Sequence, residues 1–197
     1  MAYDPRRRHP RVQFGRLVDD GVHAETLKAI TGAWIKRSGI AVDRPLLFAI
    51  RHELSAGRSL ADRIIRSGAS NQSMYYALLC LAKLNSPEDL PLVESVINSN
   101  AVLWPPRGQT VQMMLPGRKL PGRLIAGSFS VQTRDVALAV AIHLRGRKPT
   151  EFGIPVIPSD ETVFVVYSMG FETQEDRDRS LSSYRAEFPD SPSKDQE

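Results

Sequence analysis

The segment VQTRDVALAVAIHLRG, residues 131–146, constrains the fold of this chain more than any other stretch. It is apolar without interruption from Val136 to Ile142. Thr133 is suited to cap a helix, Asp135 would lie in the first turn, and Arg145 follows the end, which suits the helix dipole at both ends. A helix that is apolar on nearly every side is buried between neighbours rather than exposed on a surface. We therefore expect residues 131–146 to lie at the centre of a helical fold.

Two earlier segments repeat this pattern. Residues 76–84, YALLCLAKL, align with residues 136–144, VALAVAIHL, at an offset of 60, and residues 46–54, LLFAIRHEL, share the frame at an offset of 30. The equivalent positions are Phe48, Leu78 and Leu138 in one column and Leu54, Leu84 and Leu144 in another. Recurring apolar helices indicate stacked helical hairpins, because a single hairpin leaves one apolar side open and the next hairpin closes it.

Helical spacing and capping signals predict helices along most of the rest of the chain. The spacing of apolar residues and the positions of Gly and Pro give helices at about 24–37, 43–57, 58–67, 74–84, 86–99 and 173–188. Leu27, Ile30, Trp34 and Ile35 would form the inner face of the first helix. In the last helix, Leu181, Tyr184 and Phe188 would point inward from a mostly charged surface. The predicted fold class is all-α.

At these residues the chain resembles HEAT-like, armadillo-type repeat proteins. Residues 73–97, SMYYALLCLAKLNSPEDLPLVESVI, look like a short HEAT unit: a helix rich in small residues, a tight turn, and a helix that opens with acids. Arg134–Ala139 and Gly170–Thr173 resemble the RDVALA and GFET elements of a group of uncharacterised planctomycete-type bacterial HEAT-repeat proteins. The resemblance covers roughly residues 24–188. It implies a short α-solenoid of about three helical hairpins and no catalytic motif.

Residues 100–130 interrupt the helical pattern. They hold four prolines and several glycines, and Thr110–Leu115 and Leu124–Val131 are typical of two short strands. We predict a small β-hairpin insertion within a repeat domain of residues 21–188. Residues 1–20, rich in Arg and Pro, would form a basic flexible N-terminal arm, and residues 189–197 a disordered tail.

Composition limits the compartment and the partners. Cys80 is the only cysteine, which excludes an internal disulfide and a cysteine-based zinc site. The sequence predicts no membrane span and no signal peptide, so we expect a cytoplasmic protein. Residues 172–197 carry eight acidic and four basic residues, a net charge of −4, so the remainder of this +4 chain carries +8.

The motifs that suggest chemistry are incomplete. His52-Glu53 begins a pattern similar to HExxH, but Ala56 stands where the second His ligand would be. Gly122–Ser128 resembles a phosphate loop without its lysine. Cys80 has apolar neighbours, which favours packing over nucleophilic catalysis, and His143 is interpreted as an exposed or hydrogen-bonded residue at a helix end. We therefore expect no enzyme activity, no cofactor and no metal.

The function that this sequence favours is a non-catalytic helical-repeat scaffold that binds another protein. The candidate contact residues lie in or beside the insertion and are of the type that anchors interfaces: Trp104, Arg107, Met113, Arg118, Lys119 and Arg123. Arg134 and Asp135 are assigned structural roles, as helix-cap and inter-repeat contacts. The alternative is nucleic-acid binding through the Arg-rich arm (Arg6, Arg7, Arg8, Arg11 and Arg16) and the basic 104–123 loop, which predicts a steep dependence on salt.

Overall fold

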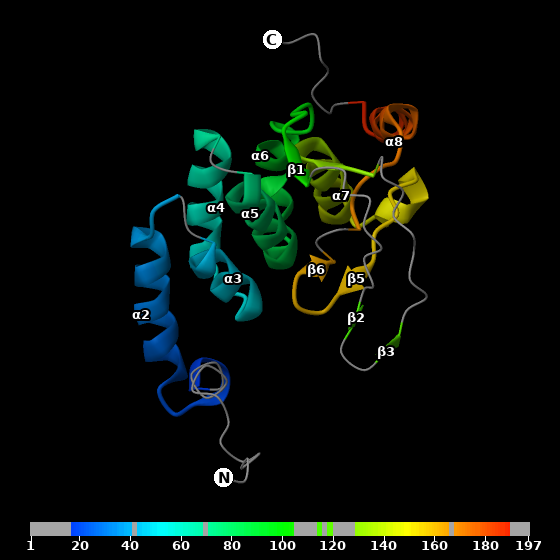
Figure 1. Cartoon of the computed structure of the whole chain (residues 1–197). Coiled ribbons are helices and arrows are strands. Elements are labelled where there is room, and N and C mark those ends of the chain that lie inside the picture. Colours follow the sequence, from blue (N-terminus) through cyan, green and yellow to red (C-terminus); the bar gives the residue numbers. More distant parts are fainter. Residues whose placement is uncertain are drawn as a thin grey trace.

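The computed structural model describes residues 17–40, 43–68, 71–104, 114–115, 118–119, 129–165 and 168–189. Within these ranges the chain is mostly helical, which confirms the predicted all-α class (Figure 1). The helices are α2 (Ala24–Arg37), α3 (Arg44–Arg51), α4 (Ala56–Ser67), α5 (Asn71–Leu84), α6 (Leu90–Glu94), α7 (Thr133–Leu144) and α8 (Gln174–Glu187), with 3-10 turns η1 (Pro87–Asp89) and η2 (Pro149–Phe152). Residues 17–20, the end of the predicted flexible arm, are also helical, and Val18 is buried.

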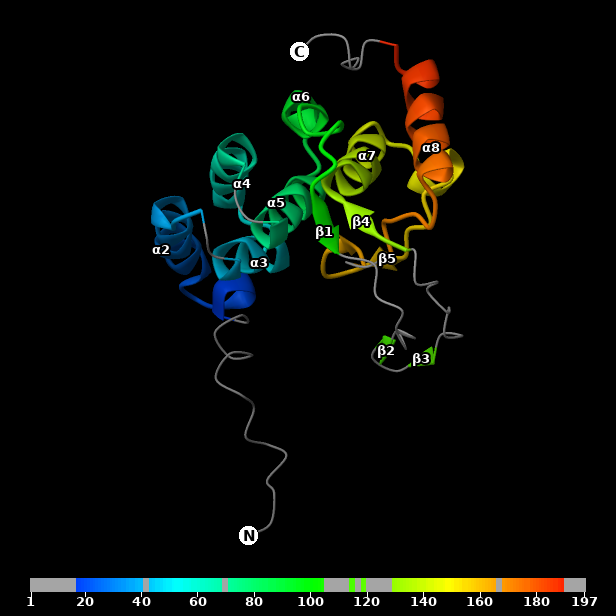
Figure 2. The ribbon, with the colours of Figure 1, turned by 45° about the horizontal axis from the view of Figure 1, so that its top comes forward.

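The helices lie in two rows. In Figure 2, α2, α4 and α6 form one row, and α3, α5 and α7 form the other. Helix α5 packs against α3 on one side and α7 on the other, α2 packs against α4, and α6 packs against α7. The three segments that the sequence aligns, residues 46–54, 76–84 and 136–144, therefore belong largely to the three helices of one row. Helix α8 crosses the end of the array beside α7.

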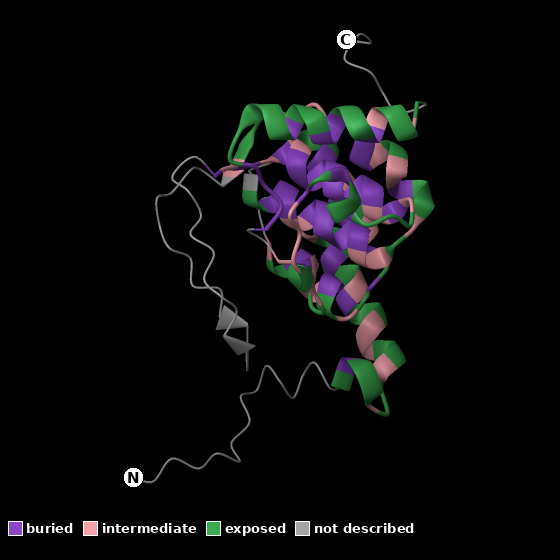
Figure 3. Ribbon diagram, turned by 90° about the vertical axis from the view of Figure 1, so that its right-hand side faces the viewer, coloured by how far each residue is buried: buried purple, intermediate pink, exposed green. Residues whose placement is uncertain are grey.

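The core is centred on α5 and α7, and Figure 3 shows the buried residues gathered in the interior of the helical array. In α7, every residue from Val136 to Ile142 is at most 2 % exposed, as expected for a helix that is apolar all round. Helix α5 is buried in the same way from Ala77 to Ala82. Helix α7 carries three alanines in its buried part, at positions 137, 139 and 141, which lets neighbouring backbones approach closely without leaving voids.

The start of α7 is fixed by a reciprocal cap. Gln132, rather than the predicted Thr133, is the N-cap residue, and its side chain accepts from the backbone N–H of Asp135. The carboxylate of Asp135 in turn accepts from the backbone N–H of Gln132 at 2.8 Å. Each side chain satisfies a backbone donor that the helix leaves open, so the pair defines where α7 begins.

Two predicted helix ends need correction. Helix α3 ends at Arg51 rather than at Gly57, and Gly57 instead lies buried inside α4. A Cβ atom on Gly57 would come within 2.6 Å of the Cys80 sulfur and 2.7 Å of the Ala49 Cβ, so this glycine is required by close helix packing and not by a helix end. The predicted helix 86–99 is also shorter, because after Glu94 the chain continues as turns.

Short antiparallel strands accompany the helices. Strand β1 (Val102–Trp104) pairs with β4 (Val131–Gln132), β2 (Met114–Leu115) pairs with β3 (Arg118–Lys119), and β5 (Pro158–Ser159) pairs with β6 (Val163–Phe164). The predicted strand pairing therefore needs correction. The end of Thr110–Leu115 pairs with Arg118–Lys119 in the Pro/Gly segment, while Val131 pairs with the unpredicted strand β1. Residues 124–128 of the second predicted strand lie outside the described part of the chain.

Candidate functional site

A group of apolar side chains on α2 and α3, here called the α2–α3 apolar surface, consists of the exposed Ile30, Trp34 and Leu47 and the partly buried Phe48. Ile30 is 62 % exposed, Trp34 48 % and Leu47 37 %. Ile30 and Trp34 lie one turn apart on α2, and the Trp34 ring packs edge-on against Phe48, with centroids 6.4 Å apart. A contiguous exposed patch of this kind marks a contact site more often than a scattered single residue does.

The α2–α3 apolar surface borders a hollow of about 500 Å³. Ile50, which is almost fully buried, contributes to its lining, and the wall opposite α3 comes from Glu161 and Thr162 between β5 and β6. Arg51 on α3 forms an exposed ion pair with Glu161 at 3.6 Å. An exposed pair of this length contributes little free energy, about 0–1 kcal/mol, and can exchange for another carboxylate.

Contacts below the surface hold Phe48 in place. The Phe48 ring lies 4.3 Å from the His52 ring, centroid to centroid. His52 Nδ1 lies 2.7 Å from Asp19 Oδ1, and the His52 side chain is only 2 % exposed. His52 therefore joins the N-terminal helical residues to α3.

Basic side chains flank the apolar ones. On α2, Ile30, Trp34 and Arg37 follow at spacings of four and three, so they share one face. On α3, Arg44 and Arg51 stand one turn before and after the Leu47–Phe48 pair and line the hollow. Within the described ranges, Arg37 and Arg44 form no ion pair or hydrogen bond through their side chains. The surface thus combines apolar anchors with available positive charge.

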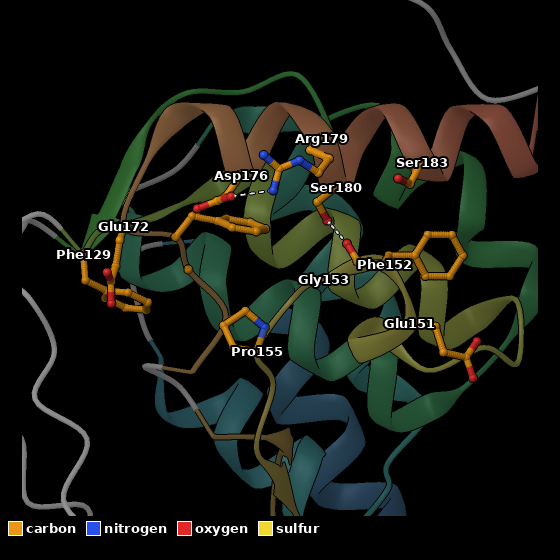
Figure 4. Close-up of a pocket in the computed structure, with 12 residues that line it drawn as sticks. Phe129, Glu151, Phe152, Gly153, Pro155, Glu172, Asp176, Arg179, Ser180 and Ser183 are labelled. Carbon is orange, nitrogen blue, oxygen red and sulfur yellow. Dashed lines mark hydrogen bonds and ion pairs between the residues drawn. The ribbon is translucent and has the colours of Figure 1, made fainter.

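A second hollow, of about 450 Å³, lies between η2 and α8 (Figure 4). Its lining includes Phe129, Phe152 and Phe171, together with Asp176, Arg179, Ser180 and Ser183 of α8. Its polar groups are largely engaged within the protein: Arg179 pairs with Asp176 at 2.8 Å, and the Ser180 hydroxyl donates to the Phe152 carbonyl oxygen at 2.6 Å. No His or Cys lines it among the described residues.

Two buried ionic networks fasten α8 to the array. Arg177 of α8 donates to the Asp135 carboxylate of α7, and its guanidinium also reaches Ser130. Arg134 donates to the side chains of Gln132 and Gln174. Desolvation raises the pKa of Asp135 and outweighs the opposing effect of Arg177. Arg134 and Asp135 therefore connect α7 to α8.

The second network lies at the other end of α7. Arg145 donates to the Tyr184 hydroxyl at 2.9 Å and to Glu94 Oε1 at 2.8 Å, and Tyr184 donates to the same carboxylate. The Arg145 guanidinium also lies 4.4 Å from the centroid of the Phe188 ring. Three elements, α6, α7 and α8, are joined in this way, and each polar group of the cluster has a partner, as burial requires.

The two residues considered as catalytic candidates, Cys80 and His143, are both shielded from solvent, Cys80 fully and His143 in part. Cys80 is fully buried, which confirms the predicted packing role, and burial raises the pKa of its thiol to about 12, with a smaller contribution from the Asp89 carboxylate. His143 is half-buried, its ring edge-on to Phe164 at 5.5 Å, and burial lowers its pKa. Among the described residues, no group of three or more His, Cys, Asp or Glu side chains is placed to hold a metal ion.

The predicted contact residues of the insertion fall almost entirely outside what the structure describes. Arg107, Met113 and Arg123 lie outside the described residues. For Trp104, Arg118 and Lys119 the backbone is described, in β1 and β3, and the side chains are not. The five arginines of the N-terminal arm also lie outside the described residues.

No protein-family model, curated protein or solved structure matches this chain. No helix in the described ranges is both long enough and apolar enough to cross a membrane.

The sequence reasoning missed the α2–α3 apolar surface, although a signal for it was present. Successive residues of a helix are separated by about 100°, so Trp34 and Ile35 cannot both face the same neighbour. In the structure Ile35 is fully buried and Trp34 is half exposed. The expectation that all four apolar residues of α2 face inward is therefore wrong for Ile30 and Trp34, because the buried arc, centred on Thr31 and Ile35, is narrower.

Proposed function

We propose that this protein is a non-catalytic helical-repeat scaffold that binds a partner protein through the α2–α3 apolar surface. The observation that carries the proposal is the exposure of Trp34 beside Ile30 and Leu47, at the border of a hollow. Tryptophan and arginine are the residue types most enriched among energetically dominant interface positions. Trp34, with Arg44 and Arg51 nearby, supplies both.

The arrangement of the helices in two rows supports this proposal. Helices α2 and α3, α4 and α5, and α6 and α7 are interpreted as three HEAT-like hairpins, with one helix of each in either row (Figure 2). In such a short solenoid an end hairpin has a neighbour on one side only, so its outer apolar residues stay open unless a partner covers them. Helix α2 and the adjoining surface of α3 belong to the first hairpin, which accounts for where the exposed residues lie.

Site-specific photocrosslinking tests the proposal. An aromatic photoreactive amino acid would replace Trp34 in one variant of the chain and Lys36, an exposed residue of α2 that lines a different hollow, in a matched control. Both variants would be expressed in cells of the source organism, and crosslinked species would be identified by mass spectrometry. We expect a defined protein partner from position 34 and not from position 36. Equal yields from both positions, or no crosslinked protein from either, would rule out this surface as the binding site.

The insertion stays a second candidate contact for the same scaffold function. Strands β1 and β4 pair beside the start of α7, and the insertion leaves the helical array between them. Replacing residues 104–123 with a Gly/Ser linker in the full chain would remove the predicted anchors. A loss of the crosslink from position 34 in that variant would mean that insertion and helical surface act together, whereas an unchanged crosslink would assign binding to the helices alone.

A further inference from the structure

The chemistry of the α2–α3 apolar surface restricts which partner it can accept. We infer that its occupant is an acidic amphipathic helix, whose apolar side contacts Ile30, Trp34 and Leu47 and whose carboxylates meet Arg37, Arg44 and Arg51. This inference rests on the proposed function and gives it a partner class. Three observations lead to it: the satisfied backbone of the surface, its charge, and the exchangeable ion pair at its border.

The first observation concerns hydrogen bonding. The α2–α3 apolar surface is built on two helices whose main-chain groups bond within the helices, so it presents side chains only. An extended segment laid on such a surface would leave its own N–H and C=O groups without partners at an apolar contact. A helix satisfies its backbone internally and presents side chains at positions i, i+4 and i+7, the same spacing as Ile30, Trp34 and Arg37.

The second observation is the sign of the charge. Residues 24–51 carry Lys28, Lys36, Arg37, Arg44 and Arg51 against Glu25 and Asp43, which is five positive charges and two negative ones. Lys28 is paired with Glu25 at 3.1 Å, so the charge that remains available is almost entirely positive. Carboxylates that flank the apolar contact are therefore attracted, and cationic partners are repelled.

The third observation is the contact between Arg51 and Glu161. The two charges are 3.6 Å apart, and their side chains are 64 % and 77 % exposed. Glu161 thus stands where a partner carboxylate would stand, at the edge of the hollow. An incoming acid can replace it at small cost, because a solvent-exposed pair is worth little.

Three other occupants fit this surface less well. A two-fold dimer through this surface would bring the arginines of one copy against those of the other, which is unfavourable. The residues of this chain beyond Pro189, DSPSKDQE, are acidic but hold no large apolar side chain to fill the hollow. Positive charge would attract a nucleic acid and Trp34 could stack one base, but the aliphatic side chains of Ile30 and Leu47 beside it offer no ring for the next base.

Two designed peptides test the inference on the full-length protein. One is an amphipathic helical peptide with Leu on one face and Glu on the other, and its twin carries Lys in place of every Glu. Fluorescence anisotropy should show the Glu peptide binding at least about tenfold more tightly, with affinity that falls as salt rises. The double variant Arg37→Glu/Arg44→Glu should reverse this preference. Neither arginine pairs with another described residue, so the fold should not depend on them.

Further measurements distinguish an acidic helix from the other possible occupants. Trp34→Ala should weaken the Glu peptide by about tenfold or more while the circular dichroism spectrum and unfolding midpoint stay close to those of the unaltered chain. Equal binding of the two peptides, binding of neither, or tighter binding of a single-stranded oligonucleotide would overturn the inference. Sedimentation showing a dimer that Trp34→Ala dissociates would also overturn it. If a protein still crosslinks from position 34 while the peptides fail, the proposed function stands and the acidic-helix assignment does not.

Discussion

The Arg177 guanidinium donates to the Asp135 carboxylate with an Nε–Oδ1 distance of 2.6 Å, at a point where both side chains are at most 5 % exposed. A second contact, from Nη2 to Oδ2 at 3.2 Å, makes the pair bidentate. The two residues belong to different helices, α8 and α7. This pair is therefore a long-range tether for a terminal helix whose outer surface is charged.

Asp135→Asn should destabilise the protein strongly. The substitution keeps the shape of the side chain but leaves the Arg177 charge buried without a counterion, which costs about 3–5 kcal/mol. Urea unfolding followed by circular dichroism would measure the change in the free energy of unfolding. The control is Arg179→Ala, which breaks the exposed Arg179–Asp176 pair on the same helix and should cost less than about 1 kcal/mol. Similar losses of unfolding free energy in the two variants would show that the buried Asp135–Arg177 pair is no more important for stability than the exposed pair.

Acid should destabilise the protein in part through His143. Burial lowers the pKa of His143 below its ordinary value of 6.5, so below that pH the unfolded chain takes up the proton before the folded chain does. Stability from this residue is complete above about pH 6.5 and is lost as pH falls toward the lowered pKa. The unfolding midpoint of His143→Gln should therefore fall less on acidification than that of the unaltered chain. Parallel pH profiles for the two proteins would contradict this.

Two glycine substitutions should act in opposite directions. A methyl group at Gly57 meets the Cys80 sulfur and the Ala49 Cβ at under 3 Å, so Gly57→Ala should cost about 1–3 kcal/mol through overpacking. The matched change Gly32→Ala lies inside α2, where the nearest atom, Ala56 Cβ, is 3.4 Å away, and should add up to about 1 kcal/mol through helix propensity. Thermal unfolding would compare them. A gain in stability for Gly57→Ala would mean that α4 is not tightly packed against α3 and α5.

The single thiol should be unreactive in the native protein. Cys80 is fully buried, and burial raises its pKa to about 12, so the nucleophilic thiolate is scarce at neutral pH. Alkylation by iodoacetamide, followed by mass spectrometry, should be slow in buffer and complete in concentrated urea. Because Cys80 is the only cysteine, each modified molecule reports one site. Rapid labelling in buffer would show that α5 opens without global unfolding.

Periodicity and capping signals predicted the extents of most helices well. The predicted helix 24–37 matches α2 at both ends, and 58–67 matches α4 to within two residues. The run VALAVAI is compatible by its apolar pattern with a buried strand as well as a buried helix, and the cap before it and the basic residues after it favour the helix. Gly68, with φ of 61°, ends α4 at the position that the sequence predicts, since glycine adopts the left-handed conformation at low cost.

Long-range partners could not be predicted from local pattern. In α8, Leu181 and Tyr184 are buried as expected, but Arg177 is buried too, among acids that are exposed as predicted. Nothing near Arg177 in the sequence marks it, because its partner Asp135 lies 42 residues earlier in the chain. The hollow beside Trp34 could not be predicted for the same reason. Its lining includes Glu161 and Thr162, which lie between β5 and β6, far from α2 and α3 in the sequence.

The pairing of β1 with β4 has an evolutionary consequence. The two strands bring Val102 opposite Gln132 and Trp104 opposite Val131, so the two ends of the segment between β1 and β4 are held at one place beside the helical array. Once the ends of a segment are fixed together, lengthening it costs little: each doubling of a flexible loop adds only about 0.6 kcal/mol of closure free energy. This site can therefore accept segments of different length and sequence while the helices stay as they are. The segment between β1 and β4 can therefore change in evolution, and acquire new binding properties, while the helical core stays unchanged.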